Sequence, residues 1–139
     1  MNKRNKIDLN LLIADFDDIA PDEITELLQI QPVHKYIKGQ RKNPHNPQSP
    51  LWNGNGWRMA SGLDSYATFE DQMNAILDII EAKYDRFEKL CSQYYCEFSC
   101  AIFTYSNNEE STPWIHLGKR YHRIASALNI EFDIDLYAW

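Results

Sequence analysis

Positive and aromatic side chains are interleaved in one acid-free stretch of the sequence. Between Glu26 and Asp64 there is no acidic residue, while five lysines and arginines occur there. Cations beside planar rings suit the binding of an anionic ligand or the stacking of bases, because the charge and the ring face both attract such groups. The candidate ligand- or partner-binding residues are therefore Tyr36, Lys38, Arg41, Lys42, Trp52 and Arg58.

Three interpretations of this basic stretch are open. In the first, it folds over the acidic side of the last strand (Glu131, Asp133 and Asp135) and neutralises it internally. In the second, it binds a protein partner or covers an anionic small ligand as a lid. Nucleic acid is the least expected partner, since the net charge of the protein is −6. We expect Trp57 in the core and Trp52 exposed.

Other patterns for metal binding or catalysis are weak. Asp15, Asp17 and Glu26 fit positions 1, 3 and 12 of an EF-hand-like frame, but Ile19 and Ala20 stand where a ligand and a glycine are needed. The histidines lack metal-ligand spacing, and no phosphate loop or nucleophile elbow occurs. We expect no cofactor, no metal and no catalytic residue. A hydrolase assembled only by the fold is the weakest alternative.

Cysteine usage and hydropathy indicate a reducing compartment and no membrane. Three cysteines are too few for a secreted disulfide framework, and Cys96 and Cys100 share one strand face as predicted buried thiols. The apolar run 9–14 is too short for a signal peptide, and far below the ~20 residues that cross a bilayer. We predict a cytoplasmic protein.

Periodicity and capping signals predict the elements that position these residues. A strand over 7–16 precedes a short helix that is capped by Asp18 and ends near Leu28, and a loop follows over about 38–56. The apolar spacing of 68–92 averages about 3.7 residues, which indicates one long amphipathic helix. The remaining predictions are strands over 57–60, 95–105, 114–117 and 130–137 and a helix over 118–129. In the last strand, Phe132, Ile134 and Leu136 are expected to face the core.

Helices interspersed with strands predict an α+β protein of the ferredoxin-like sandwich type. We expect a mixed or antiparallel sheet with one long and two short helices on one face. The chain of 139 residues, 44% of them apolar, is large enough to bury a core as a single domain over 1–139. An edge strand at Trp57 or Trp114 offers a route to a homodimer.

Several local motifs occur in a recognisable order along the chain. They are the run 21–28 (Pro-Asp-Glu-Ile-Thr-Glu-Leu-Leu), Pro32, Lys38-Gly39, the run 56–59 (Gly-Trp-Arg-Met) and the closing run 133–137 (Asp-Ile-Asp-Leu-Tyr). In these motifs the chain, from about residue 8 to 137, resembles a bacterial family catalogued as domain of unknown function 4279. The resemblance implies a small single-domain protein and supplies no activity, cofactor or catalytic residue. The insert between Gly39 and Trp57 is longer than the family pattern.

The function expected from these observations is that of a non-catalytic protein-interaction module. Residues 1–63 carry eight basic and seven acidic groups, or +1, and residues 64–139 carry six and thirteen, or −7. Such an acidic protein would dock on a basic partner, for example a bacterial toxin that it neutralises. The expected contact is the acidic outer face of the long helix (Asp78, Glu81, Asp85 and Glu88). An anionic small-ligand-binding domain that uses the 35–58 segment is the alternative.

Overall fold

A mixed β-sheet forms the base of the molecule. The computed structural model describes residues 3–139, and over this range the sheet has five strands in the order β2-β3-β1-β4-β5. Neighbouring strands are antiparallel, except that β5 runs parallel to β4. The strands are β1 (Lys6–Ala14), β2 (His34–Tyr36), β3 (Gly56–Ala60), β4 (Tyr95–Thr104) and β5 (Glu131–Ala138).

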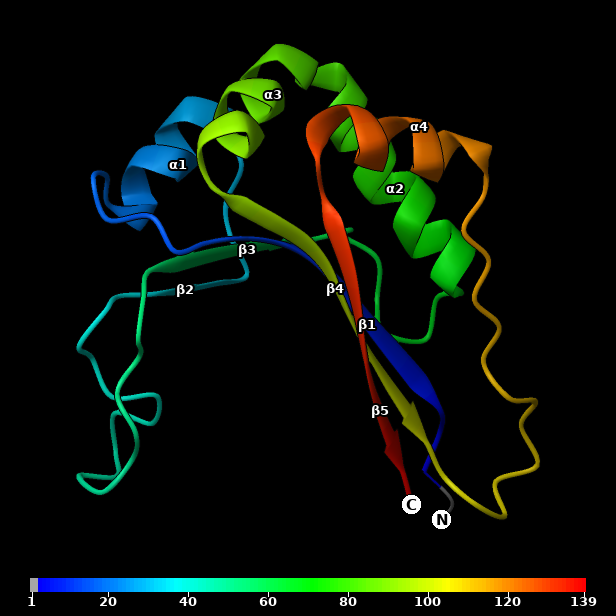
Figure 1. Cartoon of the computed structure of the whole chain (residues 1–139). Coiled ribbons are helices and arrows are strands. Elements are labelled where there is room, and N and C mark those ends of the chain that lie inside the picture. Colours follow the sequence, from blue (N-terminus) through cyan, green and yellow to red (C-terminus); the bar gives the residue numbers. More distant parts are fainter. Residues whose placement is uncertain (1–2) are drawn as a thin grey trace.

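The helices lie together on one face of this sheet (Figure 1). Within the described residues there are four of them: α1 (Pro21–Leu28), α2 (Phe69–Ala82), α3 (Tyr84–Gln93) and α4 (Lys119–Leu128). The predicted α+β class and the mixed sheet are thereby confirmed. The number and lengths of the helices differ from the prediction. No helix among residues 3–139 is long and apolar enough to cross a bilayer.

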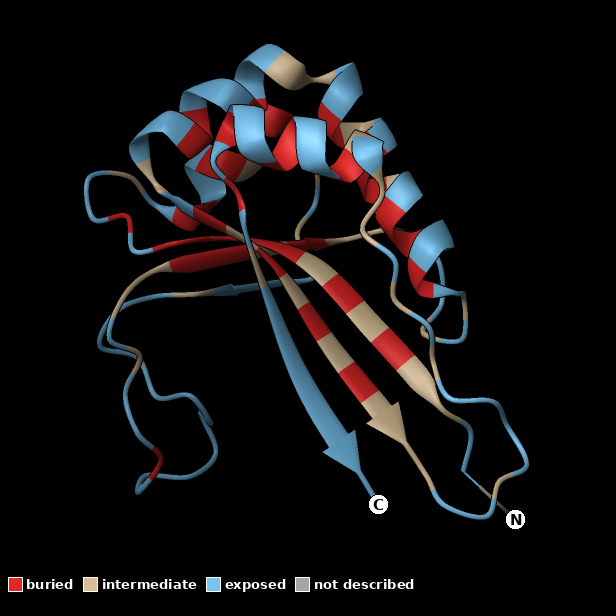
Figure 2. Ribbon diagram, turned by 45° about the vertical axis from the view of Figure 1, so that its right-hand side comes forward, coloured by how far each residue is buried: buried red, intermediate tan, exposed pale blue. Residues whose placement is uncertain are grey.

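The core lies between the helices and the sheet. Alternate residues of β1 and β4 are buried, and they form one apolar cluster with the inner faces of the helices (Figure 2). Trp57 on β3 is fully buried, as predicted, and its indole Nε1 donates a hydrogen bond to Thr25 Oγ1 of α1 at 2.9 Å. The polar end of this large ring is therefore satisfied inside the core, which fixes α1 over β3.

The predicted helix over 68–92 is wrong in one respect, because it is broken at Lys83. This residue leaves the helical region, with φ −130° and ψ 36°, and separates α2 from α3. Its ammonium Nζ donates to the carbonyl oxygens of Leu28 (2.6 Å) and Gln29 (3.4 Å) at the end of α1. A cation there satisfies carbonyls that the end of a helix leaves free. The apolar stripe continues across the break, so the spacing of the apolar residues did not reveal the break.

The start of α1 also differs from the prediction. The N-cap is Ala20, not Asp18, and the Glu23 carboxylate accepts a hydrogen bond from the Ala20 backbone N–H at 2.6 Å. The Asp18 carboxylate instead accepts from the Tyr94 hydroxyl at 2.7 Å, just after α3. This hydrogen bond is the main cause that raises the pKa of Tyr94 to about 12. Asp18 therefore links two helices rather than starting one.

Two further predictions fail at the ends of the sheet. Residues 114–117 form no strand, and the short edge strand β2 was not predicted. Phe132 packs against the core, but Ile134 and Leu136 are 48% and 65% exposed. The reason is that β5 extends beyond the helical layer, so no helix among residues 3–139 covers the inward side of its second half (Figure 2).

Gln72 is a buried amide of α2 that replaces a missing strand beside β1. The ladder between β1 and β3 begins at Asn10, so the edge of β1 before that residue has no β3 partner. There, Gln72 Oε1 accepts from the Leu9 N–H at 3.2 Å, and Gln72 Nε2 donates to the Ile7 carbonyl at 2.8 Å. The same Nε2 donates to the Ala67 carbonyl at 3.1 Å. One side chain thus satisfies three backbone groups.

The cysteines are buried free thiols. The prediction that Cys96 and Cys100 pack as small buried side chains of β4 is confirmed. A hydrogen bond with Cys91 and then burial raise the pKa of the Cys96 thiol. Burial also raises the pKa of Cys100 to about 11. These groups are therefore held in the thiol form, which is a poor nucleophile.

Candidate functional site

The side of the sheet that faces away from the helices has no helix over it, and we call it the open face. Because residues opposite each other on paired strands share a face, the strand register defines one row across all five strands. In this row His34, Arg58, Leu12, Glu97 and Glu131 follow one another. The row runs from an imidazole and a guanidinium at the β2 end to two carboxylates at the β5 end.

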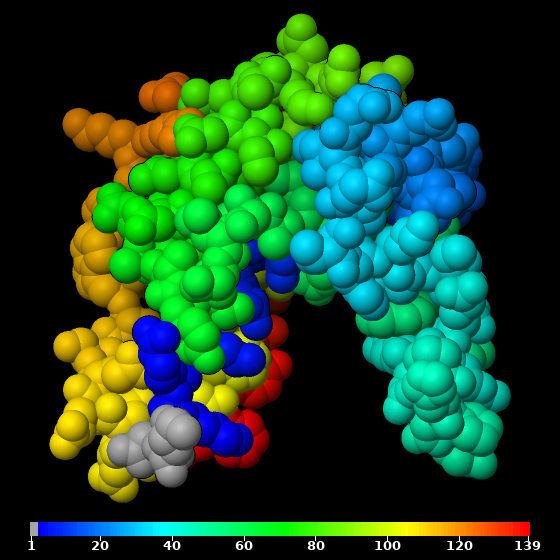
Figure 3. Space-filling model, turned by 180° about the vertical axis from the view of Figure 1, so that it is seen from behind, coloured from blue at the N-terminus to red at the C-terminus, as the bar shows by residue number. Residues whose placement is uncertain are grey.

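The segment between β2 and β3 stands away from the body of the protein, and we call it the arm (residues 37–55). In the space-filling view, the arm and the far ends of β1, β4 and β5 form the two legs of an arch (Figure 3). The hollow of the arch lies on the open face of the sheet. The molecule therefore presents a wide concave surface rather than a flat sheet.

The arm is a loop, as predicted for about 38–56, and backbone hydrogen bonds join its two sides as in a hairpin. The backbone N–H groups of Gly39 and Trp52 donate to the carbonyls of Trp52 and Gln40 at 2.9 and 2.8 Å. The Lys42 N–H donates to the Pro50 carbonyl at 2.8 Å, next to an isolated bridge between Arg41 and Leu51. Because the arm satisfies its own backbone groups in this way, it keeps its form while it projects from the sheet.

One asparagine fastens the base of the arm. The Asn55 side chain donates to the Phe16 carbonyl at 2.8 Å and accepts from the Lys38 N–H at 2.8 Å. The Asn55 backbone carbonyl also accepts from the Asp15 N–H at 2.9 Å. Both strands of the arm are thus tied to the end of β1, which sets the direction in which the arm leaves the sheet.

Aromatic rings join the arm to the sheet. Tyr36 of β2 stacks on Trp52 of the arm, with ring centroids 3.8 Å apart and planes at 15°. The His34 ring lies 6.0 Å from the Trp52 ring, and the Lys42 ammonium lies 5.0 Å from it on a ring face. Tyr36 covers Gly56 so closely that any Cβ at that glycine would overlap the Tyr36 ring. This packing requires a glycine at the first position of β3.

Four of the six predicted site residues line one pocket at the base of the arm. Its volume is about 460 Å³, and its walls include Tyr36, Arg41, Lys42 and Trp52. Arg58 is half-buried on the open face beside this pocket, opposite His34. Lys38 is exposed on the arm and does not line the pocket. Trp52, predicted to be exposed, is half-buried by its stacking on Tyr36.

The charges of the open face act on the Tyr36 hydroxyl. Burial is the main cause that raises the pKa of Tyr36 above its usual value. The Arg58 guanidinium opposes this increase, while the carboxylates of Asp15 and Glu97 add to it. Tyr36 therefore senses groups from both halves of the open face and stays protonated and able to donate a hydrogen bond at neutral pH.

The β4–β5 half of the open face is acidic. Glu97 lies opposite Glu131, and Asp133 and Asp135 follow at alternate positions on the same face of β5. The Tyr95 hydroxyl donates to the Glu97 carboxylate at 2.6 Å, and this hydrogen bond raises the pKa of Tyr95. All three β5 carboxylates are exposed. Like charges this close repel one another and favour a cationic partner.

The arm does not neutralise this acidic half within the molecule. Within residues 3–139, no ion pair joins an arm cation to a β5 carboxylate. The pairs that form are elsewhere, for example between Lys35 and Asp22 at 2.5 Å. Figure 3 shows the arm and the far end of β5 on opposite legs of the arch. The interpretation in which the basic stretch covers the last strand is therefore wrong.

The acidic face of the predicted long helix is partly neutralised. Arg120 of α4 pairs with Asp78 (2.6 Å) and Glu81 (2.9 Å) of α2. The hydrogen bond from Arg120 is the main cause that lowers the pKa of Glu81, while the Asp78 carboxylate opposes this effect. Of the four acids of this face, Asp85 and Glu88 of α3 form no ion pair within residues 3–139. This face is a weaker docking surface than the sequence indicated.

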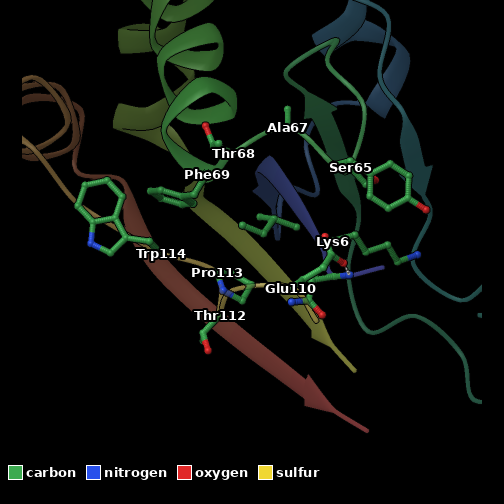
Figure 4. Close-up of a pocket in the computed structure, with 12 residues that line it drawn as sticks. Lys6, Ser65, Ala67, Thr68, Phe69, Glu110, Thr112, Pro113 and Trp114 are labelled. Carbon is green, nitrogen blue, oxygen red and sulfur yellow. Dashed lines mark hydrogen bonds between the residues drawn. The ribbon is translucent and has the colours of Figure 1, made fainter. Parts of the chain in front are cut away.

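A second, mostly apolar pocket lies below the start of α2, and no sequence pattern predicted it (Figure 4). Its volume is about 260 Å³, and Ile7, Phe69, Pro113 and Trp114 supply its apolar wall. Lys6 and Glu110 are among its polar lining groups. Trp114 was expected in a strand, but the chain around it is irregular and Trp114 lines this pocket.

Within residues 3–139, no group of three or more His, Cys, Asp or Glu side chains is placed to hold a metal ion. Three of the histidines pack against aromatic rings. His34 lies beside Tyr36 and Trp52, and His116 stacks on Trp114 at 5.4 Å. His122 meets the edge of Tyr121.

The sequence model of one protein family covers nearly the whole chain. The family is described as "Domain of unknown function (DUF4279)", and its model matches residues 5–139. No curated protein and no solved structure matches the chain. The family resemblance predicted from the motifs is confirmed, and the match extends slightly beyond the residues that carried it.

Proposed function

The chain belongs to the DUF4279 family, and within that family we propose that it acts as a non-catalytic protein-interaction module that receives its partner on the open face. One observation carries this proposal. The open face is concave, and in residues 3–139 its arm cations and β5 carboxylates form no ion pairs with one another or with the body. Charged groups that remain unpaired on a concave surface are available to complement a partner.

The polar and aromatic content of this surface also suits protein recognition. Tyr95 and Tyr137 are 40% and 44% exposed, and Leu51 of the arm is 48% exposed. Interfaces are enriched in aromatic residues, which supply large contact areas at low entropy cost. A basic protein such as a toxin would fit the acidic half of the open face, and the arm would contact a different part of the same partner.

We also propose a ferredoxin-like class for the fold and a cytoplasmic location for the protein. We assign the strands β2-β3-β1-β4 to a ferredoxin-like arrangement, with α4 and β5 as an addition. The support is that β1, α1 and β2 form a crossover into which β3 inserts, while α2 and α3 cross from β3 to β4. We also assign the protein to the cytoplasm, and its three free buried cysteines support a reducing compartment.

Charge reversal on two surfaces tests where the partner binds. We expect Glu131→Lys with Asp133→Lys to reduce protein retained from a native lysate at least about tenfold, because two attractive charges become repulsive. The matched control reverses two unpaired acids of α3, Asp85→Lys with Glu88→Lys, and should retain as much as wild type. The measurement is quantitative co-purification at low salt with an untagged copy of the chain present. If only the α3 variant retains less protein, the partner binds the helices instead of the open face. If the wild-type chain retains no protein at all, the proposal is contradicted.

A second candidate function is supported by the pocket at the base of the arm. His34, Arg41 and Lys42 line it together with the Tyr36 and Trp52 rings, which suits a planar anionic ligand. If it binds nucleoside phosphates, a saturating nucleoside diphosphate should raise the Tm by several degrees. Lys42→Ala should abolish that shift while the control Lys89→Ala keeps it. Flat melting curves for mono-, di- and triphosphates would reject this function.

A further inference from the structure

We propose that the partner on the open face is a second copy of this chain, in a two-fold dimer in which each arm lies on the acidic half of the other copy. This inference rests on the proposed function, whose partner it names. It is argued from the charges, the shape and the exposed apolar groups of the open face.

The two charged halves of the open face are complementary to each other. The arm presents Lys38, Arg41 and Lys42, which are all exposed. The acidic half presents Glu131, Asp133 and Asp135, which are also exposed. A surface that carries both signs in separate regions is self-complementary under a two-fold rotation, because each positive region then meets a negative one.

This contact cannot be satisfied within one chain. The arm is held in its direction by Asn55 and by the stacking of Tyr36 on Trp52. It stands on the leg of the arch opposite the ends of β4 and β5 (Figure 3). The arm and the acidic half of one copy are therefore kept apart, whereas the hollow beside the acidic half can admit the arm of another copy.

Exposed apolar groups accompany the charges on both sides. The arm carries Ile37 and Leu51, which are 45% and 48% exposed. On the β4–β5 side, Tyr137 stacks on Phe103 at 4.9 Å and stays 44% exposed. Burial of such groups supplies association energy that salt does not screen, while the charges fix the orientation. We therefore expect a dimer that is weakened, but not abolished, by salt.

A pair of charge-reversal variants tests the dimer directly. The arm variant is Lys38→Glu with Lys42→Glu, which leaves the hydrogen bond from Arg41 to the Ser49 carbonyl intact. The strand variant is Asp133→Lys with Asp135→Lys. In a homodimer of either variant, the arm and the facing strand carry the same sign of charge at both symmetric contacts. We therefore expect its dimer dissociation constant to rise at least about 30-fold. Sedimentation equilibrium at low salt measures this change.

Mixing the two variants gives the decisive result. In a heterodimer the acidic arm of one variant meets the basic strand of the other, and the second contact keeps its natural charges. We expect an equimolar mixture to form a one-to-one dimer, seen by native mass spectrometry, with affinity near that of wild type. A control with Lys89→Glu and Lys119→Glu on the helices should dimerise like wild type.

Each outcome of this experiment has a defined meaning. A wild-type chain that stays monomeric at about 100 µM and low salt, well above a micromolar dissociation constant, overturns the dimer. In that case the proposed function survives if Glu131→Lys with Asp133→Lys retains less of some other protein from the lysate than wild type does. A wild-type dimer that the mixture fails to restore overturns the placement of the arm on the acidic half. If the wild-type chain neither dimerises nor retains any other protein from the lysate, both proposals are overturned.

Discussion

Gln72→Leu is expected to destabilise the protein by about 2–5 kcal/mol, although it replaces one buried side chain with another of similar size. The leucine would leave the Leu9 N–H and the carbonyls of Ile7 and Ala67 without the partners they now have. Gln72 is only 3% exposed, so water has little access to replace those hydrogen bonds. The cost is that of orphaned buried polar groups, and it exceeds the gain from an added apolar side chain.

Urea unfolding followed by far-UV circular dichroism measures the effect. Gln93→Leu is the matched control, because Gln93 lies exposed at the end of α3 and its substitution should change the free energy of unfolding by less than about 0.5 kcal/mol. Amide exchange adds a local measurement, since the Leu9 N–H should lose protection in the Gln72 variant. A Gln72→Leu protein as stable as wild type would contradict the role of the amide as a substitute strand.

Gly56→Val is expected to release the arm and to destabilise the protein by about 1–3 kcal/mol. The valine side chain would occupy the space of the Tyr36 ring, which lies directly over the glycine. The ring would be displaced, and the stacking of Tyr36 on Trp52 that holds the arm would be lost with it. We expect amides of the arm to exchange faster and any binding that needs a fixed arm to weaken.

A double-mutant cycle separates this steric effect from other costs of the substitution. In a Tyr36→Ala background the space above residue 56 is empty, so Gly56→Val should cost much less than in wild type. The coupling between the two positions is then on the order of 1–2 kcal/mol, measured by chemical unfolding. Equal costs in both backgrounds would show that the glycine is required for a reason other than the Tyr36 ring.

Local patterns predicted the elements with regular periodicity. The buried face of β4, the inner face of α4 and the capped start of α2 at Thr68 follow from spacing and side-chain chemistry within a few residues. The α+β class follows from the order of these elements. The acid-free stretch also identified Tyr36, Arg41, Lys42 and Trp52, which the fold brings to one pocket.

The features that were missed depend on contacts between distant residues. The helix break at Lys83 is stabilised by carbonyls of residues 28 and 29, more than fifty positions earlier. The exposure of Ile134 and Leu136 depends on where the helical layer ends, which no pattern inside the strand encodes. His34 and Glu97 joined the candidate site only through the register of the strands. Alternation along each strand could have indicated their faces, but not their neighbours.

The position of β1 has a consequence for how the chain folds as it is made. This first strand lies at the centre of the sheet, between β3 and β4, and its residue Leu11 pairs with Met59 and Phe98. During synthesis one edge of β1 therefore stays unpaired until β3 has left the ribosome, and the other edge until β4 has followed much later. Such long sequence separations slow folding and expose an apolar segment meanwhile. Until β4 arrives, the apolar edge of β1 is thus open to pairing with other chains, which is a route to aggregation.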